Sequence, residues 1–259
     1  MATAKIIDQP LPQEMQQHTY AIMYDVEGTH WWFVGRRRII SDFVKRIISD
    51  LKRERPRILD VGCGTGANLE MLSRFGEAEG VDVSAEALAF CRTRGIQSVR
   101  QGEAGQLPYD DNSFDLVTGL DVVEHLDDDL AALKEMSRVL RPGGRALFFV
   151  PAFMFLWGVQ DDISNHRRRY TLAGLKQVAL QAGFEIERAS YVNITFFAPI
   201  FLGRLLMRAT GFRPASENNI NVPALNGLLG SILGAESFIL RLMNFPFGVS
   251  IICDARRID

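Results

Sequence analysis

The sequence has few cysteines, and none of them stand close together. Cys63, Cys91 and Cys253 are its three cysteines, and no pair has the two-residue spacing of a CxxC motif. Disulfide scaffolds and zinc sites depend on closely spaced thiols. We therefore predict neither a disulfide framework nor a metal site, and this cysteine usage fits a reducing cytoplasm.

The sequence also lacks an excess of either charge and any long apolar run. Its 259 residues include 29 Lys and Arg against 31 Asp and Glu, a formal net charge of -2. That balance creates no overall field that would attract nucleic acid, so we expect no nucleic-acid partner. No stretch of about 20 residues is apolar without interruption, and residues 1–12 have no apolar signal core. We therefore expect no transmembrane helix and a cytoplasmic location.

What the chain does have is a regular alternation of apolar runs and amphipathic segments. Hydrophobic residues make up 47% of the sequence, enough for a substantial core. Apolar runs predict strands near residues 58–61, 80–83, 96–99, 114–117, 146–150, 184–192 and 248–256. Helical patterns fall between them at residues 67–75, 84–94, 130–140 and 171–182. Strands that alternate with helices predict an α/β fold with a parallel sheet and right-handed crossovers.

The two ends of the pattern differ from this core. A loose tail over residues 1–13 is followed by a short helix at 13–24 and an amphipathic helix at 36–51. Residues 195–247 are apolar with sparse charge, which predicts two helices joined by a polar loop at 214–221. We divide the chain into an N-terminal helical segment (1–56), a core (57–194 and 248–259) and an apolar insertion (195–247).

The first strand leads into a glycine-dense turn, ILDVGCGTG over residues 58–66. Glycines at positions 62, 64 and 66 let the backbone turn sharply and approach a ligand without a clashing Cβ. A dinucleotide fingerprint would need its third glycine at position 67, which is Ala67. The spacing therefore disfavours a dinucleotide.

Two acids accompany this turn. Asp60 would repel a pyrophosphate but suits a ligand with an amino group. Asp82 ends the second strand, where a carboxylate accepts hydrogen bonds from ribose hydroxyls. An amino acid joined to a ribose is the profile of S-adenosylmethionine.

Five segments carry a family resemblance: ILDVGCGTG, GVDVS, GEAGQLPYDDNSFDLV, LDVVEHLDD and VLRPGG, in that order within residues 58–144. At these residues the chain resembles the class I S-adenosylmethionine-dependent methyltransferases. The HWWF and NHRRRYT segments, at residues 30–33 and 165–171, resemble the small-molecule subgroup called methyltransferase domain 11 or 12. The resemblance implies a Rossmann-like sheet of seven strands, with helices on both faces and an antiparallel strand seven between strands five and six.

The same resemblance implies S-adenosylmethionine as cofactor, S-adenosylhomocysteine as product, and a set of cofactor residues. Carried over to this chain, the cofactor residues are Asp60, Gly62, Gly64, Gly66, Asp82, Val83, Glu103, Ala104 and Leu120. The family often has Asp where this chain has Glu103.

Residues on the acceptor side are less well specified. His166 and His125 are candidate bases, because histidine titrates near neutral pH. Loop hydrogen bonding, capping and core packing are alternative roles for them. Arg167, Arg168 and Arg169 either pair with nearby acids or bind an acidic group of the acceptor. The candidate acceptor-binding residues are His30, Trp31, Trp32, Trp157, Arg168 and Tyr170.

These observations predict a methyltransferase that acts on a small, lipophilic acceptor, with O-methylation favoured. One alternative is C- or N-methylation of an acceptor whose acidic group binds Arg167–Arg169. Another is a donor-binding subunit without catalytic activity. The insertion at 195–247 could cover the acceptor, touch a membrane surface without spanning it, or form a homodimer interface.

Overall fold

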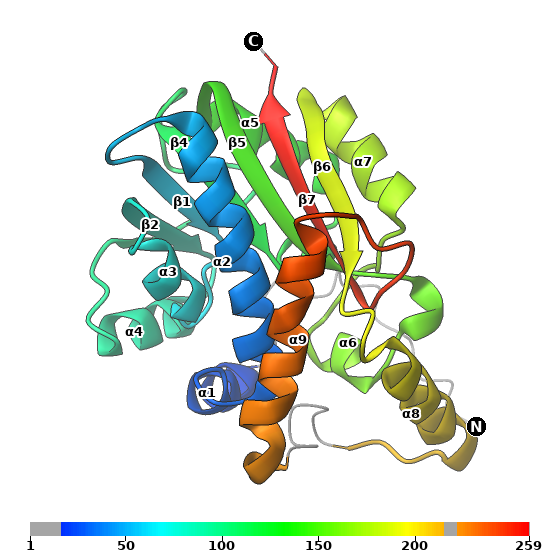
Figure 1. The fold of residues 1–259 in the computed structure, drawn as a ribbon. Helices are drawn as coiled ribbons and strands as arrows, with labels where there is room; N and C mark the ends of the chain where they lie inside the picture. The colour runs from blue at the N-terminus through cyan, green and yellow to red at the C-terminus, as the bar shows by residue number, and fades with distance from the viewer. Residues whose placement is uncertain (1–16, 215–221, 259) are drawn as a thin grey trace, which may run out of the picture.

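The computed structural model describes residues 17–214 and 222–258, which form one seven-stranded sheet with helices on both faces (Figure 1). The tail predicted at residues 1–13 and most of the loop predicted at 214–221 lie outside these residues. The strands are β1 (Arg57–Val61), β2 (Glu77–Asp82), β3 (Val99–Gln101), β4 (Phe114–Leu120), β5 (Leu140–Pro151), β6 (Phe184–Val192) and β7 (Ser250–Arg257).

The strand order is β3-β2-β1-β4-β5-β7-β6. Strands β1 to β5 pair in parallel, whereas β7 runs antiparallel to both β5 and β6. This arrangement confirms the predicted class I sheet with its inserted strand seven. From β1 the chain crosses to β2 and β3 on one side of the sheet, whereas β4 lies on the opposite side of β1, so the strand order reverses at β1. Ligands of open α/β sheets bind beyond the strand ends at such a reversal.

Helices cover both faces of the sheet and explain why its central strands are apolar throughout. All seven residues of β4 are buried, and so are the last eight residues of β5. The covering helices are α3 (Ala67–Leu72), α4 (Ala85–Thr93), α5 (Asp129–Val139) and α7 (Leu172–Gln181), with α2 (Trp31–Leu51) beside α9 (Asn226–Leu240). A strand buried on both faces has no polar side to alternate with.

The N-terminal segment forms α1 (Gln17–Val26) and α2, and α2 begins five residues earlier than predicted. His30 is its N-cap, and the Nδ1 atom of this residue accepts a hydrogen bond from the Trp32 backbone N–H at 3.2 Å. The tryptophan pair therefore belongs to the first turn of α2. Histidine is an uncommon cap, so the sequence pattern gave no clear start signal here.

Two predicted strands are displaced in the structure. The third strand was expected at 96–99 and lies at Val99–Gln101, whereas the fifth extends from Leu140 rather than from 146. β3 is an edge strand, so its polar residues Arg100 and Gln101 face solvent while their backbone pairs with β2. Apolar periodicity therefore predicts the position of a buried strand better than that of an edge strand.

The insertion forms two helices as predicted, α8 (Phe197–Thr210) and α9, with a short 3-10 turn η4 (Pro223–Leu225) before α9. Leu233 of α9 is fully buried against α2, where a Cβ on Gly35 would lie 2.7 Å from the Leu233 Cβ. The Glu236 carboxylate accepts hydrogen bonds from the backbone N–H groups of Asn193 (2.7 Å) and Thr195 (2.9 Å). These contacts fix α9 to the core.

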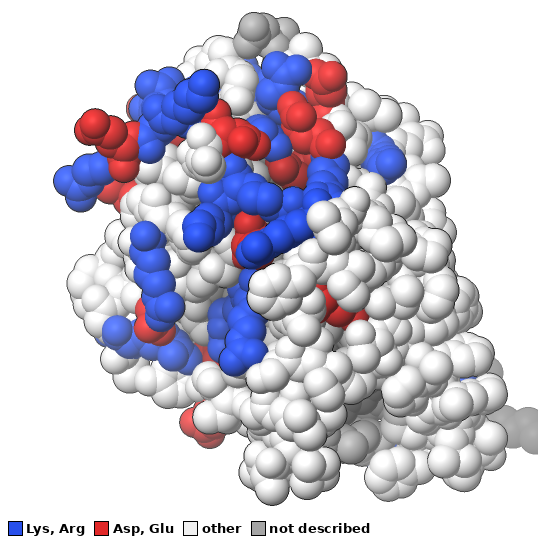
Figure 2. Space-filling model, in the orientation of Figure 1, with Lys and Arg blue, Asp and Glu red and all other residues white. Residues whose placement is uncertain are grey.

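By length and composition, residues 223–240 could cross a membrane, which the sequence analysis did not anticipate, and 39% of this stretch is buried inside the fold. One face of α9 packs on α2, and Leu228, Ile232, Phe238 and Ile239 remain exposed on the other. Figure 2 shows that charged side chains gather over the upper left of this view, while the surface over α8 and α9 has few.

We expect Leu233→Ala to lower the free energy of unfolding by about 2–5 kcal/mol, because it removes fully buried methyl groups at the α2–α9 contact. Leu228→Ala on the same helix is the control: this side chain is 60% exposed, and the expected change is within about 0.5 kcal/mol. Urea denaturation of both variants measures the difference. Equal effects would show that α9 does not pack as described.

Candidate functional site

A cavity of about 440 Å³ opens at the carboxyl ends of β1, β2 and β4. Its walls come from the α1–α2 junction, the glycine turn, the turn after β4, the loop after β5, and α8. Ligand pockets commonly have volumes of about 300–1,000 Å³. One cavity therefore joins the cofactor residues and the acceptor segments that were predicted from distant parts of the sequence.

The glycine turn forms one wall of the cavity. Gly62 and Gly64 have φ of +69° and +54°, a left-handed region that L-residues with side chains rarely adopt. A Cβ on Gly62 would lie 2.5 Å from the Val122 side chain, whereas one on Gly64 would meet no described atom within 4 Å. The Gly64 backbone thus faces open space, as a ligand cradle requires.

Asp82 connects this turn to the next strand. Its carboxylate accepts hydrogen bonds from the backbone N–H groups of Gly64 (2.8 Å) and Ser84 (2.9 Å). Asp82 also lines the cavity. A carboxylate at the end of the second strand is the group type that accepts hydrogen bonds from ribose hydroxyls.

Asp60 lies behind the turn, outside the cavity lining, and is 1% exposed. Its Oδ1 accepts a hydrogen bond from the Thr118 hydroxyl at 2.6 Å, and its Oδ2 has no partner among the described residues. Burial raises the pKa of Asp60 to about 7, although the Thr118 bond and the charge of Arg36 oppose the shift. A nearby cationic amino group would favour its ionised form.

The cofactor predictions meet different outcomes. Six of these residues line the cavity: Gly62, Gly64, Asp82, Val83, Ala104 and Leu120. Asp60, Gly66 and Glu103 are not among its lining residues. Gly66 faces Cys91 and Ile96 of the α4 region, and Glu103 is exposed to solvent. The orphaned Asp60 oxygen, the open space at Gly64 and the acceptor set at Asp82 together fit S-adenosylmethionine.

The N-terminal segment forms the opposite wall. His30, Trp31 and Trp32 all line the cavity, as predicted for the acceptor side. Glu27 joins this wall to the glycine turn, because its carboxylate accepts hydrogen bonds from the Thr65 hydroxyl and from Arg94. The wall and the turn are therefore held as one unit.

His166 is held in place by a buried carboxylate. Its Nδ1 lies 2.8 Å from Asp161 Oδ1, and Arg169 Nη1 lies 2.9 Å from both oxygens of the same group. Burial alone would raise the pKa of Asp161, but the bond with His166 and the charge of Arg169 lower it to about 2. An ionised Asp161 orients His166 with Nδ1 as the donor, which makes Nε2 the acceptor.

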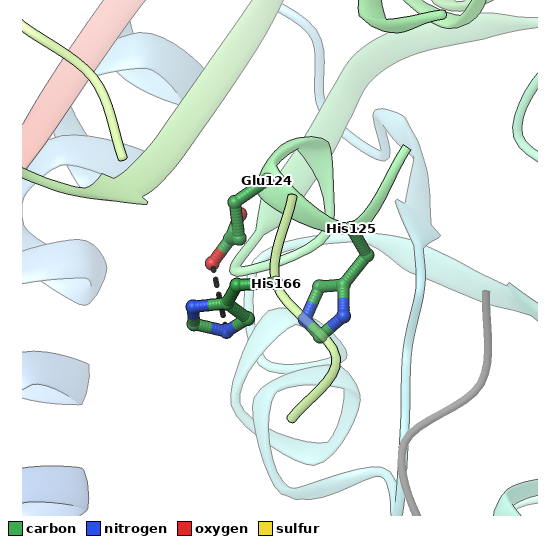
Figure 3. Close-up of side chains that lie close together, drawn as sticks. All are labelled: Glu124, His125 and His166. Atoms are coloured by element: carbon green, nitrogen blue, oxygen red, sulfur yellow. Dashed lines mark ion pairs between the residues drawn. The ribbon is translucent and has the colours of Figure 1, made fainter. Parts of the chain in front are cut away.

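Glu124 and His125, from the short turn η1 (Val123–His125), lie beside His166 (Figure 3). Burial raises the pKa of Glu124 to about 8 and lowers that of His125 to about 3. Neither Glu124 oxygen has a hydrogen-bond partner among the described residues, and Glu124 Oε1 lies 3.9 Å from His166 Nε2. The cluster therefore places a buried neutral histidine and a buried carboxyl group beside His166.

One ligand atom each from Glu124, His125 and His166 lies within 4.8 Å of the others, a set that could hold a metal ion. Burial dominates at Glu124 and raises its pKa, while the charges of Arg36 and Arg169 oppose that shift. A metal ion at this site would be repelled by these two cations.

Arg36 of α2 lines the cavity together with the glycine turn and the histidine cluster. It is 6% exposed, pairs with Asp121, and lies 5.5 Å from the centroid of the Phe149 ring. Burial lowers its pKa to about 10, so it stays cationic at neutral pH. Asp121 directly follows β4 and has a φ of +60°, a conformation that is uncommon for a residue with a side chain.

Three predicted acceptor residues lie outside this cavity. Trp157 lines a separate cavity of about 230 Å³ and donates its indole N–H to Asp162 at 2.8 Å. Arg168 pairs with Asp129 at 3.0 Å and donates to the carbonyls of Leu126 and Asp127. The Tyr170 hydroxyl donates to Asp129 at 2.6 Å. The polar group of each residue is therefore engaged by an acid, either Asp162 in the same loop or Asp129 at the start of α5.

Sequence reasoning missed several cavity residues: Tyr20, Met23, Arg36, Asp161, Ile200, Arg204 and Met207. Arg36 and Arg204 carried a signal, because a charged residue on an otherwise apolar helix face is costly unless it is paired. The acids that they approach, Asp121 and Asp161, lie far away in the sequence, so that pairing was not readable. Asp161 itself was within reach of the sequence: loop hydrogen bonding of His166 and pairing of Arg167–Arg169 with nearby acids were among the alternatives, and His166 and Arg169 do contact Asp161.

The sequence is similar to those of known methyltransferases. Residues 59–148 match the family described as Methyltransferase domain. Demethylmenaquinone methyltransferase of Staphylococcus aureus is 41% identical over 109 residues, which cover 39% of this chain and 45% of that enzyme. The chain thus spans under half the length of that relative.

Solved structures show the same fold. A Haloferax volcanii protein in complex with the Trm112 methyltransferase activator is 18% identical, with a TM-score of 0.59, covering 93% of this chain and 95% of that one. A Thermotoga maritima S-adenosylmethionine-dependent methyltransferase is 19% identical, with a TM-score of 0.56, covering 93% and 100%.

We expect Asp82→Ala to weaken S-adenosylmethionine binding by about 10- to 150-fold, because hydrogen bonds to a charged group contribute about 1.5–3 kcal/mol. Glu103→Ala is the control, since Glu103 is exposed and outside the cavity lining. Calorimetry measures both affinities. A loss on Glu103→Ala that matched the loss on Asp82→Ala would contradict the described cofactor wall.

Proposed function

We propose that this chain, an S-adenosylmethionine-dependent methyltransferase by its domain and fold, methylates an oxygen atom of a small lipophilic acceptor. One observation carries the proposal: a single cavity extends from the glycine turn to the His166–Asp161 pair, and aromatic and aliphatic side chains line its walls. The donor half supplies an activated methyl group, and the other half is suited to an apolar molecule with one polar atom.

The donor half would hold the cofactor through backbone and carboxylate groups. Gly62 and Gly64 give close approach, and Asp82 offers acceptors for ribose hydroxyls. Asp60 lies behind the turn with a pKa raised to about 7 by burial, and the cationic end of a bound donor would favour its ionised form. Bound S-adenosylmethionine supplies a methyl group on a sulfonium, so the protein's main task is to align the acceptor with it.

The acceptor half has an apolar body and a polar end. Trp31, Trp32 and Phe33 of α2 lie on one side, and Ile200 and Met207 of α8 lie on the other. The histidine cluster and Arg36 form the polar end. A molecule with an apolar skeleton and a hydroxyl group would match both parts.

His166 would receive the hydroxyl proton. Its Nδ1 is engaged by the ionised Asp161 carboxylate, so Nε2 is the position that accepts a proton. His125 is a weaker candidate, because burial lowers its pKa to about 3 and a base that weak removes protons poorly at neutral pH. Both histidines were candidates in the sequence, and their environments separate them.

The alternative acceptor, which would have an acidic group bound by Arg167–Arg169, has less support from the contacts of these arginines. Arg167 pairs with Asp127 at 2.8 Å, and Arg168 pairs with Asp129, both outside the cavity lining. Arg169 lines the cavity but forms a two-oxygen contact with Asp161. These arginines organise the loop after β5 around the histidine cluster.

Transfer from isotopically labelled S-adenosylmethionine to a panel of hydroxylated lipophiles tests the function. In that assay we expect His166→Gln to lower kcat by about 10²- to 10⁴-fold, the usual contribution of a general base. Donor affinity should stay within about twofold, since His166 lies at the acceptor end. Raising the pH should restore part of the activity, because the hydroxyl then ionises without a base.

The matched variant Asp161→Asn should lower kcat in the same direction, because it removes the charge that orients His166. Unchanged kcat in His166→Gln would remove the base assignment. Loss of wild-type activity on treatment with EDTA would replace proton transfer with a metal-dependent mechanism. Donor binding without transfer to any hydroxylated lipophile would favour the non-catalytic subunit.

A further inference from the structure

The exposed apolar side chains of this protein are concentrated in one segment. Seventeen large hydrophobic residues of the described chain are exposed, and thirteen of them lie between Leu202 and Phe247. Met154 and Phe155 add two more beside α8, since Arg208 of α8 donates to the Phe155 carbonyl. Isolated exposed hydrophobics are ordinary, but a concentration of this kind marks an interaction surface.

We call this surface the apolar face. It is defined by the exposed residues of α8, of η4 and the outer side of α9, and of the turns beside them: Leu202, Leu205, Leu206, Phe212, Val222, Leu225, Leu228, Ile232, Phe238, Ile239, Leu242 and Met243. Leu206, Leu228 and Leu242 are 63%, 60% and 89% exposed. Figure 2 shows few charged side chains over α8 and α9.

The exposed charges of the apolar face, within the part of the chain that the structure describes, have one sign. Among the described residues of 196–247, the exposed charged side chains are Arg208, Arg213 and Arg241. Glu236 is the acid among these same residues, and it is 2% exposed because it bonds to backbone N–H groups inside. Arg213 and Arg241 pair with Asp162 and Asp42 on neighbouring elements. Arg208 instead donates to the carbonyls of Phe155 and Trp157, which are uncharged partners.

Helices that lie in a membrane interface typically have leucine and phenylalanine on one face with basic residues beside them. The apolar face has this composition, and its helices α8 and α9, which the structure describes in full, carry no exposed acid. Protein–protein interfaces usually surround an apolar centre with a polar, solvent-accessible rim. Anionic headgroups complement the arginines of this face. The observations therefore favour a bilayer over a protein partner.

The apolar face is also continuous with the cavity. Ile200, Gly203, Arg204 and Met207 of α8 line the cavity, while Leu202, Leu205 and Leu206 of the same helix point outward. One helix therefore separates the acceptor half of the site from the exposed surface. A lipophilic acceptor, which this step takes from the proposed function, would cross only the thickness of α8 to reach the site.

We propose that the apolar face docks on an anionic bilayer, with α8 and α9 lying in the plane of the headgroups and the cavity opening beside them. The buried contacts of Leu233 and Glu236 keep α9 packed on the core during docking. The protein thereby samples lipophilic acceptors that are dissolved in the membrane.

Vesicle flotation of the full chain, without donor or acceptor, tests the docking. The vesicles are phosphatidylcholine alone and phosphatidylcholine mixed with phosphatidylglycerol. We expect binding to the mixed vesicles that weakens with added salt. The double variant Leu206→Asp with Leu228→Asp should lose about 100-fold or more in vesicle affinity, because each substitution removes an inserted leucine.

Leu180→Asp is the matched control, since Leu180 is 55% exposed on α7, outside the apolar face, and its vesicle affinity should be unchanged. Circular dichroism confirms that each variant is folded. Equal loss in the control and the double variant, or no flotation of the wild type with either vesicle, would overturn the proposal. A dimer in sedimentation that the double variant disrupts would assign the face to a second copy.

These outcomes are separable from the proposed chemistry. Transfer to a soluble hydroxylated acceptor is measured without vesicles, so activity with no flotation rejects docking alone. Flotation without transfer to any acceptor rejects the chemistry alone.

Discussion

The bond between the Asp82 carboxylate and the Gly64 backbone is the constraint on which the site depends. It joins the carboxyl end of β2 to the turn after β1, while Ser84 N–H, at the start of α4, bonds to the same carboxylate. Gly62 and Cys63 add backbone bonds to the Val81 carbonyl. The turn cannot relax toward a conformation that would fill the cavity, because its glycines are held at positive φ by these bonds. Preorganised backbone and a shared carboxylate together create the donor half.

The acceptor half depends on a second buried carboxylate, Asp161. Its carboxylate accepts hydrogen bonds from Arg169, from the Gly158 backbone N–H and from the His166 ring. The Arg204 side chain of α8 lies 3.7 Å from the same carboxylate. Burying an acid at 1% exposure is costly unless cations and donors compensate it. The compensation also links the loop to α8, so that a single charge network orients the histidine and positions the helix that separates cavity from surface.

Much of the fold was readable from the sequence, because buried strands and amphipathic helices follow simple periods. β6 was predicted at its observed bounds, and Ser84 and Thr171, the first residues of two predicted helical segments, are the N-caps of α4 and α7. The glycine turn and Asp82 were predicted because local spacing specifies them. The edge strand β3 and the start of α2 were displaced, since an edge needs no apolar pattern and His30 is an unusual cap. Arg36 and Arg204 were missed because the acids that they approach, Asp121 and Asp161, lie far along the chain. The contacts of Asp161 with His166 and Arg169 are local, and they match the loop hydrogen bonding and acid pairing that the sequence left open. Arg168 and Tyr170 bond to Asp129 instead of facing the cavity.

Amide hydrogen exchange with and without S-adenosylhomocysteine tests most directly that this cavity is the donor site. The account predicts added protection at residues 62–65 and 82–84, with smaller changes at 102–104, where the cavity is lined by backbone from the ends of β1, β2 and β3. The exposed side of α9, on the apolar face, should exchange as before. Protection confined to residues outside the cavity lining, or no protection at a concentration that saturates binding, would contradict the account.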